Sequence, residues 1–119
     1  MALTVYAYPQ CGTCKKAKRW LDDHNISYNE KHIVEEPPSK AELEKLHKNS
    51  GLELRKFFNT SGKKYRELGL KDQVKDASEE ELLDWLASDG MLIKRPIVTD
   101  GTNVTIGFKE QEFEERWKQ

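Results

Sequence analysis

The chain has 119 residues, of which 20 are basic and 21 acidic, so its formal net charge is −1. This length fits one domain with a single core, and the balanced charge excludes the strong overall field that draws proteins to nucleic acid or anionic membranes. The first residues lack the basic and apolar regions of a secretory signal, and no apolar run is long enough to span a bilayer. We therefore expect a cytoplasmic protein.

The chain opens with a predicted β-α-β unit. Residues 3–8 are rich in β-branched and aromatic side chains and predict a strand, which ends at Pro9. Apolar side chains then recur at helical spacing and predict a helix to about residue 24. Residues 27–34 predict a second strand.

Cys11 and Cys14, the only cysteines of the chain, lie where the first strand gives way to the first helix. Unpaired backbone N–H groups and the helix dipole favour an anion at this position, and a thiolate is an anion. Such a site can lower the pKa of a cysteine from roughly 8.5 to about 3.5–7.5. Cys14, one helical turn on, can attack an adduct on Cys11 and close an internal disulfide. The pair thus predicts a redox device in which Cys11 is the nucleophile and Cys14 the resolving residue.

Two other interpretations of the cysteines are weaker. A structural disulfide over three residues would constrain the unfolded chain very little. A zinc site needs four ligands, and the spacing of the histidines does not supply the missing two: His24, His32 and His47. We favour redox chemistry over a metal site and over inert cysteines, and we expect no metal ligands.

The middle of the chain is predicted to be helical. Ser39 and Glu42 form a capping box for a helix that ends near Gly51. A short helix should follow, with a buried face and an end at residues 59–62. The residues of that face are Leu54, Phe57 and Phe58.

A second capping box begins the best-marked helix of the chain. Ser78 and Glu81 form the box, apolar residues at helical spacing follow, and Gly90 is suited to cap the C-terminal end. We expect the helices over approximately residues 39–89 to form one insert.

The last part of the chain predicts a β-hairpin and a helix. The hairpin pattern comprises residues 91–93 and 97–98, a turn at Asp100–Gly101 and residues 104–108. A final helix carries Phe113 and Trp117. We expect the tryptophans in the core: Trp20, Trp85 and Trp117.

The order β-α-β, helical insert, β-β-α predicts an α/β fold. With a right-handed crossover it builds a four-stranded mixed sheet with helices on both faces. This is the thioredoxin-like plan, and we expect it as a single domain over residues 1–119. In that plan the proline that opens the third strand is cis and lies against the cysteines, which assigns this role to Pro96.

Five motifs together resemble the glutaredoxin-linked arsenate reductase family, which also includes the regulators Spx and MgsR. The motifs are YPQCGTC (8–14), EPPS (36–39), NTSG (59–62), YRELGL (65–70) and RPIV (95–98). Their order and spacing match the family from residue 3 to about residue 117. The resemblance implies a thioredoxin-like domain with a helical insert, a nucleophilic Cys11, and Arg95 beside it to favour the thiolate. It also implies a substrate groove at Gly12, Thr13 and Pro96.

The chain departs from the arsenate reductases of this family at the oxyanion site. Those enzymes resemble Cys-Gly-Thr-Ser at the loop and use three arginines, of which only Arg95 has a counterpart here. Asn59 stands in place of the second, and residues 105–108 lack the third. A tetrahedral oxyanion needs several charge-assisted donors, so arsenate should be a poor substrate.

Other residues are similar to the Spx and MgsR side of the family. Cys14 replaces the serine, and residues 107–110 (GFKE) also match. Spx-type regulators bind the RNA polymerase α subunit through the insert, and Lys48 and Gly51 fall approximately where that surface has an arginine and a glycine. The resemblance therefore implies a candidate partner surface there.

We expect a monomeric thiol–disulfide redox protein with no resident cofactor. Its reductant would be thioredoxin, glutaredoxin or glutathione, with glutathione also a candidate co-substrate. No direct contact with nucleic acid or a membrane is expected. The alternatives are a redox-switched regulator bound to the RNA polymerase α subunit, and an arsenate reductase.

Overall fold

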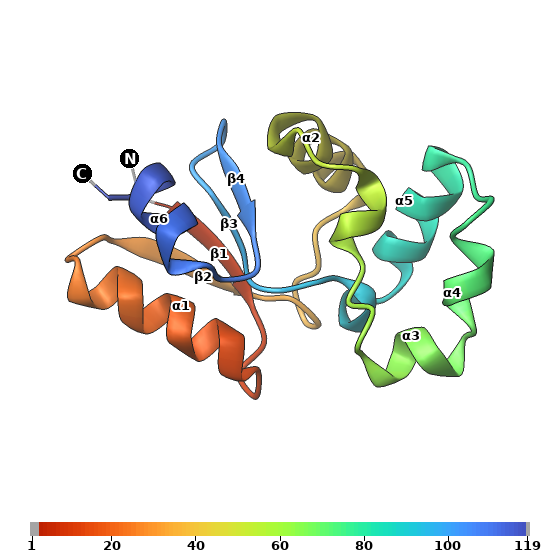
Figure 1. Cartoon of the computed structure of the whole chain (residues 1–119), viewed down its shortest axis with the longest axis horizontal. Coiled ribbons are helices and arrows are strands. Elements are labelled where there is room, and N and C mark those ends of the chain that lie inside the picture. Colours follow the sequence, from red (N-terminus) through yellow and green to blue (C-terminus); the bar gives the residue numbers. More distant parts are fainter. Residues whose placement is uncertain (1–2, 119) are drawn as a thin grey trace.

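The computed structural model describes residues 3–118 and contains one four-stranded sheet (Figure 1). The strands are β1 (Leu3–Ala7), β2 (Tyr28–His32), β3 (Ile97–Thr99) and β4 (Val104–Ile106), in the spatial order β2-β1-β3-β4. Strand β1 runs parallel to β2 and antiparallel to β3, and β3 pairs antiparallel with β4. The mixed sheet expected from the order of elements is thereby confirmed.

Helices cover both faces of the sheet. Successive residues of β1 point to opposite faces, and apolar side chains of β1 are buried on each of them. Val5 and Ala7 pack with side chains of α1 (Gly12–Asp23) and α6 (Glu110–Arg116). Tyr6, between them, packs on the other face against the core of the insert. Figure 1 shows the sheet, α1 and α6 to the left of the view, with α3 (Lys63–Glu67), α4 (Leu70–Gln73) and α5 (Glu79–Ser88) to the right.

The insert begins with α2 (Lys40–Ser50), which the sequence marks clearly. The Ser39 hydroxyl accepts a hydrogen bond from the Glu42 backbone N–H at 3.1 Å, and the Glu42 side chain accepts one from the backbone of Ser39, so the capping box is confirmed. Gly51 ends the helix with a φ of +70°, in the left-handed region that suits glycine.

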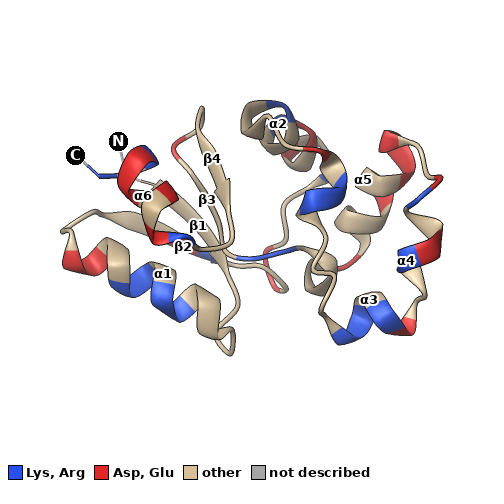
Figure 2. Ribbon diagram, viewed as in Figure 1, with Lys and Arg blue, Asp and Glu red and all other residues tan. Residues whose placement is uncertain are grey.

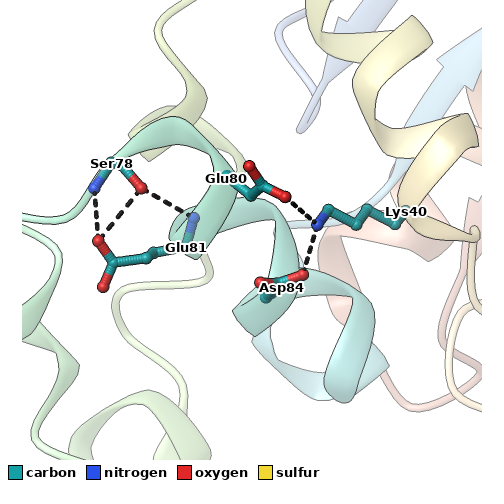
Figure 3. Close-up of polar contacts among 5 residues, drawn as sticks. All are labelled: Lys40, Ser78, Glu80, Glu81 and Asp84. Carbon is teal, nitrogen blue, oxygen red and sulfur yellow. Dashed lines mark hydrogen bonds and ion pairs between the residues drawn. The ribbon is translucent and has the colours of Figure 1, made fainter.

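The later part of the insert packs α5 (Glu79–Ser88) against α2. The second capping box, Ser78 with Glu81, is confirmed. Lys40 of α2 reaches Glu80 and Asp84 of α5 at 3.2 and 2.7 Å (Figure 3). Two ion pairs thus join helices that are far apart in the sequence.

Several predictions for the insert were incomplete. The short helix at Leu54–Phe57 is a 3-10 helix, η1, and two further short helices, α3 (Lys63–Glu67) and α4 (Leu70–Gln73), carry no pattern from which they could be predicted. The stretch 91–93 does not belong to the hairpin. It overlaps the 3-10 turn η2 (Gly90–Leu92), and Ile93 forms an isolated bridge with Phe58.

The predicted capping role of Gly90 was wrong. Helix α5 ends at Asp89, whose backbone is extended, and Gly90 does not have a positive φ. Gly90 lies instead against the backbone of Ile33 and Val34, where any Cβ atom would overlap the Ile33 carbonyl oxygen. The glycine is needed for close approach of two backbones, which a sequence cannot reveal.

The three tryptophans differ in burial. Trp20 and Trp117 are buried on the face of the sheet that α1 and α6 cover. The Trp117 indole N–H donates to the Thr105 hydroxyl at 3.1 Å. Trp85 is only half-buried at the edge of the insert core. The expectation of a core position therefore holds fully for two of the three.

Candidate functional site

Cys11 caps the N-terminal end of α1, as the sequence predicts. Its backbone is extended, with φ −85° and ψ 117°, and its Sγ accepts a hydrogen bond from the Cys14 backbone N–H at 3.3 Å. The Cys11 side chain is half-buried, whereas Cys14 is completely buried among apolar side chains on the sheet face that α1 and α6 cover. Cys11 and Cys14 are not joined by a disulfide in this structure.

The surroundings give the two thiols opposite acidities. Burial opposes ionisation of Cys11, but hydrogen bonds from the Cys14 thiol and backbone N–H, together with the positive charge of Arg95, lower its pKa below the ordinary value. For Cys14, burial and the hydrogen bond that its thiol donates to Cys11 raise the pKa to about 12. The thiolate of the pair therefore forms on Cys11, next to the pocket described below.

Arg95 is held on two sides. Its Nη1 atom donates to the backbone carbonyls of Met91 and Ile93, both at 3.3 Å. Its guanidinium lies over the ring of Tyr8, 5.2 Å from the ring centroid. The Arg95–Pro96 peptide bond is cis, as the thioredoxin-like plan predicts for this proline. Tyr8 is a contact that sequence reasoning missed, because a lone aromatic residue in a strand reads as core.

A pocket of about 300 Å³ opens beside Cys11. Of the predicted site residues, Cys11, Thr13 and Arg95 line it. Gly12, Cys14 and Pro96 are adjacent to lining residues in the chain but do not line the pocket themselves.

The pocket also contains the positions at which the chain departs from the arsenate reductases. Asn59 and Gly107 line it, together with two cations, Lys94 and Lys109. Lys109 belongs to the GFKE motif at residues 107–110, whereas Lys94, a lysine in the coil before a strand, has no distinctive sequence pattern.

Lys48 and Gly51 lie elsewhere, at the C-terminal end of α2. Both are exposed, and neither lines the cysteine pocket. The left-handed backbone of Gly51 is accounted for by the helix end alone. Their assignment as a partner surface stays a prediction.

The histidines make local contacts away from the cysteines. His24 stacks on Trp20 with ring centroids 3.9 Å apart, His32 accepts hydrogen bonds from two backbone N–H groups, and His47 lies 3.8 Å from Glu79. Between residues 3 and 118, no group of three His, Cys, Asp or Glu side chains is arranged to hold a metal ion. No helix in that range combines the length and apolar character needed to cross a membrane.

Comparison with known proteins places this geometry in one family. A model of the ArsC family matches residues 6–116. The protein YusI of Bacillus subtilis, itself described as uncharacterized, is 63% identical over 98% of this chain and 99% of its own length. The regulatory protein MgsR of B. subtilis is 31% identical over 93% of this chain and 86% of its own length. The global transcriptional regulator Spx of Lactiplantibacillus plantarum is 30% identical over 92% and 81%.

Solved structures agree with the fold. An ArsC family related protein from Bacteroides fragilis superposes with a TM-score of 0.93 at 43% identity, covering 97% of both chains. A structure from Streptococcus mutans, described as a possible arsenate reductase, has a TM-score of 0.86 at 45% identity and covers 94% of this chain and 97% of its own.

Proposed function

The chain belongs to the ArsC family, and on that premise we propose that it is a thiol–disulfide oxidoreductase in which Cys11 attacks and Cys14 resolves. One observation carries this proposal: the half-buried Cys11 has a lowered pKa, whereas the buried Cys14, which donates to it, has a pKa raised to about 12. Cys11 thus supplies a thiolate that a substrate can reach, and Cys14 stays protonated until the second step.

The first chemical step is attack of the Cys11 thiolate on one sulfur of a substrate disulfide. A new S–S bond forms to Cys11, the substrate S–S bond breaks, and the departing thiolate takes a proton from solvent. The negative charge on Cys11 is then gone, and with it one of the causes that raise the pKa of Cys14. Cys14 becomes easier to deprotonate when its attack is needed.

In the second step, Cys14 loses its proton to solvent and its thiolate attacks the Cys11 sulfur. The Cys11–Cys14 bond forms, the Cys11–substrate S–S bond breaks, and the second substrate thiolate leaves and takes a proton from solvent. The protein dithiol has then lost two electrons and the substrate disulfide has gained them. Thioredoxin, glutaredoxin or glutathione would return the protein to the dithiol by the reverse exchange.

Arg95 serves the first step by stabilising the thiolate of Cys11. Its charge lowers the pKa of Cys11, and the carbonyls of Met91 and Ile93 with the Tyr8 ring keep the guanidinium in place. Thr13, which lines the pocket, would contact the mixed disulfide, and Gly12 and Pro96 would shape the groove through the lining residues next to them in the chain.

The test uses a neutral small disulfide, hydroxyethyl disulfide, with three proteins. The reduced wild type should lose two hydrogens by mass and release two thiols, the Cys14→Ser variant should keep a mixed disulfide on Cys11, and the Cys11→Ser variant should stay unmodified. Reaction of Cys11→Ser at the wild-type rate would contradict the assignment of the nucleophile. Turnover coupled to glutathione reductase or thioredoxin reductase then tests catalysis.

A second candidate is a redox-switched regulator, favoured by the similarity to MgsR and Spx over more than nine-tenths of the chain. The exposed Lys48 on α2 and Gly51, which caps the C-terminal end of that helix, are the proposed contact with the RNA polymerase α subunit. A switch needs two redox states with different partner affinity and no turnover. Binding of the reduced and oxidised protein to the purified C-terminal domain of that subunit, with Lys48→Glu as the disrupting variant, separates the two functions.

A further inference from the structure

Lys94 occupies an unusual place in the pocket beside Cys11. It precedes Arg95 on the stretch of coil that Figure 2 shows in blue between the insert and the sheet. Its side chain passes over Gly107, with Cε and Nζ 3.4 and 3.9 Å from the point where a Cβ atom at 107 would lie. Gly107 is buried with a φ of +80°, a backbone conformation that favours glycine, and the aliphatic end of Lys94 lies in ordinary van der Waals range of it.

All the charged residues that line the pocket are positive. Lys94, Arg95 and Lys109 line it, and none of the lining residues found among residues 3–118 is acidic. No carboxylate of the described residues lies within 4.0 Å of the ammonium of Lys94 or Lys109, so neither charge is neutralised by an ion pair within that range. Thr13, Asn59 and Ser61 add polar groups to the same wall.

Lys94 and Arg95, which are neighbours in the chain, differ in how many of their hydrogen-bond donors are free to bind a ligand. Arg95 already donates to two carbonyls and packs on Tyr8, which suits it to stabilise the Cys11 thiolate. Lys94 is exposed, and its ammonium is a flexible point charge with three donors. A cavity of about 300 Å³ is at the lower end of small-ligand pockets, large enough for a substituent beyond the reacting sulfur.

We propose that Lys94 binds a carboxylate of the substrate, so that the protein selects disulfides with negative charge close to the sulfur that Cys11 attacks. The inference rests on the proposed exchange at Cys11 and adds the substrate class. The reaction keeps its balance: the Cys11–sulfur bond forms, the substrate S–S bond breaks, and the carboxylate on Lys94 takes no part in electron transfer. Lys94 would thus determine which disulfides bind, and the attack of Cys11 on the disulfide would follow the mechanism given above.

The experiment compares three small disulfides of similar size: dithiodipropionic acid, which is dianionic, neutral hydroxyethyl disulfide, and dicationic cystamine. Rates of reaction with the reduced wild type are measured at one pH and referred to the neutral disulfide, which removes any change in the thiolate fraction of Cys11. The wild type should react fastest with the anion and slowest with the cation, and added salt should reduce the difference.

The variants isolate the role of Lys94. We expect Lys94→Gln to lower the rate with the anionic disulfide about fivefold relative to the neutral one, the size of one partly exposed charge pair. Lys94→Arg should keep the preference, and Lys71→Gln, an exposed lysine of α4 outside the pocket, should behave as the wild type.

The outcomes separate two failures. If all three disulfides react but Lys94→Gln keeps the wild-type preference, or if the wild type prefers cystamine, the specificity inference is overturned and the exchange function stands. If no disulfide reacts although neutral iodoacetamide alkylates Cys11, the proposed function itself is overturned.

Discussion

Replacement of Gly90 by alanine should lower the free energy of unfolding and raise the pKa of Cys11. A Cβ at this position overlaps the Ile33 carbonyl oxygen, and its next neighbours are backbone atoms of residues 33 and 34, which cannot move aside as a flexible side chain could. Overpacking of this kind costs about 1–3 kcal/mol. A small domain has a total stability of only about 5–15 kcal/mol, so the loss should be plain in urea unfolding.

The effect should extend to Cys11 because Gly90 begins the 3-10 turn η2. Met91 in this turn and Ile93 after it offer the carbonyls that hold Arg95. A displaced turn would loosen the guanidinium and weaken its stabilisation of the Cys11 thiolate. We therefore expect the pKa of Cys11, measured from alkylation rates against pH, to rise in Gly90→Ala.

A matched control is available in Gly12. A Cβ at Gly12 would meet no atom within 4 Å, and its φ is not positive. Gly12→Ala should leave the midpoint in urea unchanged or raise stability by about 0.4–1 kcal/mol. Equal stability of Gly90→Ala and the wild type would refute the argument that two backbones meet at this glycine.

Four further predictions concern the chemistry of the site. Iodoacetamide should label Cys11 well before Cys14, and the Cys11 rate should level off at a pH below that of an ordinary thiol because its pKa is lowered, so faster labelling of Cys14 near neutral pH would reverse the two roles. Mild peroxide should close a Cys11–Cys14 disulfide in the monomer, and a predominantly disulfide-linked dimer on non-reducing gels would contradict this. Arsenate should be reduced poorly with glutathione and glutaredoxin, and Asn59→Arg should improve the rate. Robust wild-type turnover that Asn59→Arg leaves unchanged would restore the arsenate reductase alternative. Tyr8→Leu should raise the pKa of Cys11 by freeing Arg95, and Tyr8→Phe, which keeps the ring face, should not.

The features predicted well from sequence are those with a local physical cause. The capping boxes at Ser39 and Ser78 act between residues three apart, so the chain alone specifies where α2 and α5 begin. The β-branched and aromatic composition of β1 and the apolar periodicity of α1 are likewise local properties of the sequence. Cys11 could be placed at a helix start for the same reason.

The features missed depend on contacts between distant segments. Gly90 is required by the approach of Ile33, more than fifty residues away in sequence, and its position after a helix suggested a cap instead. Helices α3 and α4 are too short to show an apolar period and are fixed by burial of Tyr65 and Leu70. Lys94 lines the pocket with Cys11, Thr13 and Asn59, which are far from it in sequence, and no linear pattern reports that they lie together.

The complete burial of Cys14 has a consequence for how the protein would handle different adducts. Oxidants, alkylating agents and substrates in solution can reach only Cys11, since Cys14 has no exposed surface. Discrimination among substrates is therefore confined to the encounter with Cys11 and its pocket. Once any adduct is attached there, the release step depends on the distance and angle between two sulfurs and on nothing in the adduct beyond its leaving ability. On the proposed mechanism, substrate selection would therefore occur only in the reaction with Cys11, and the later release step would add no further selection.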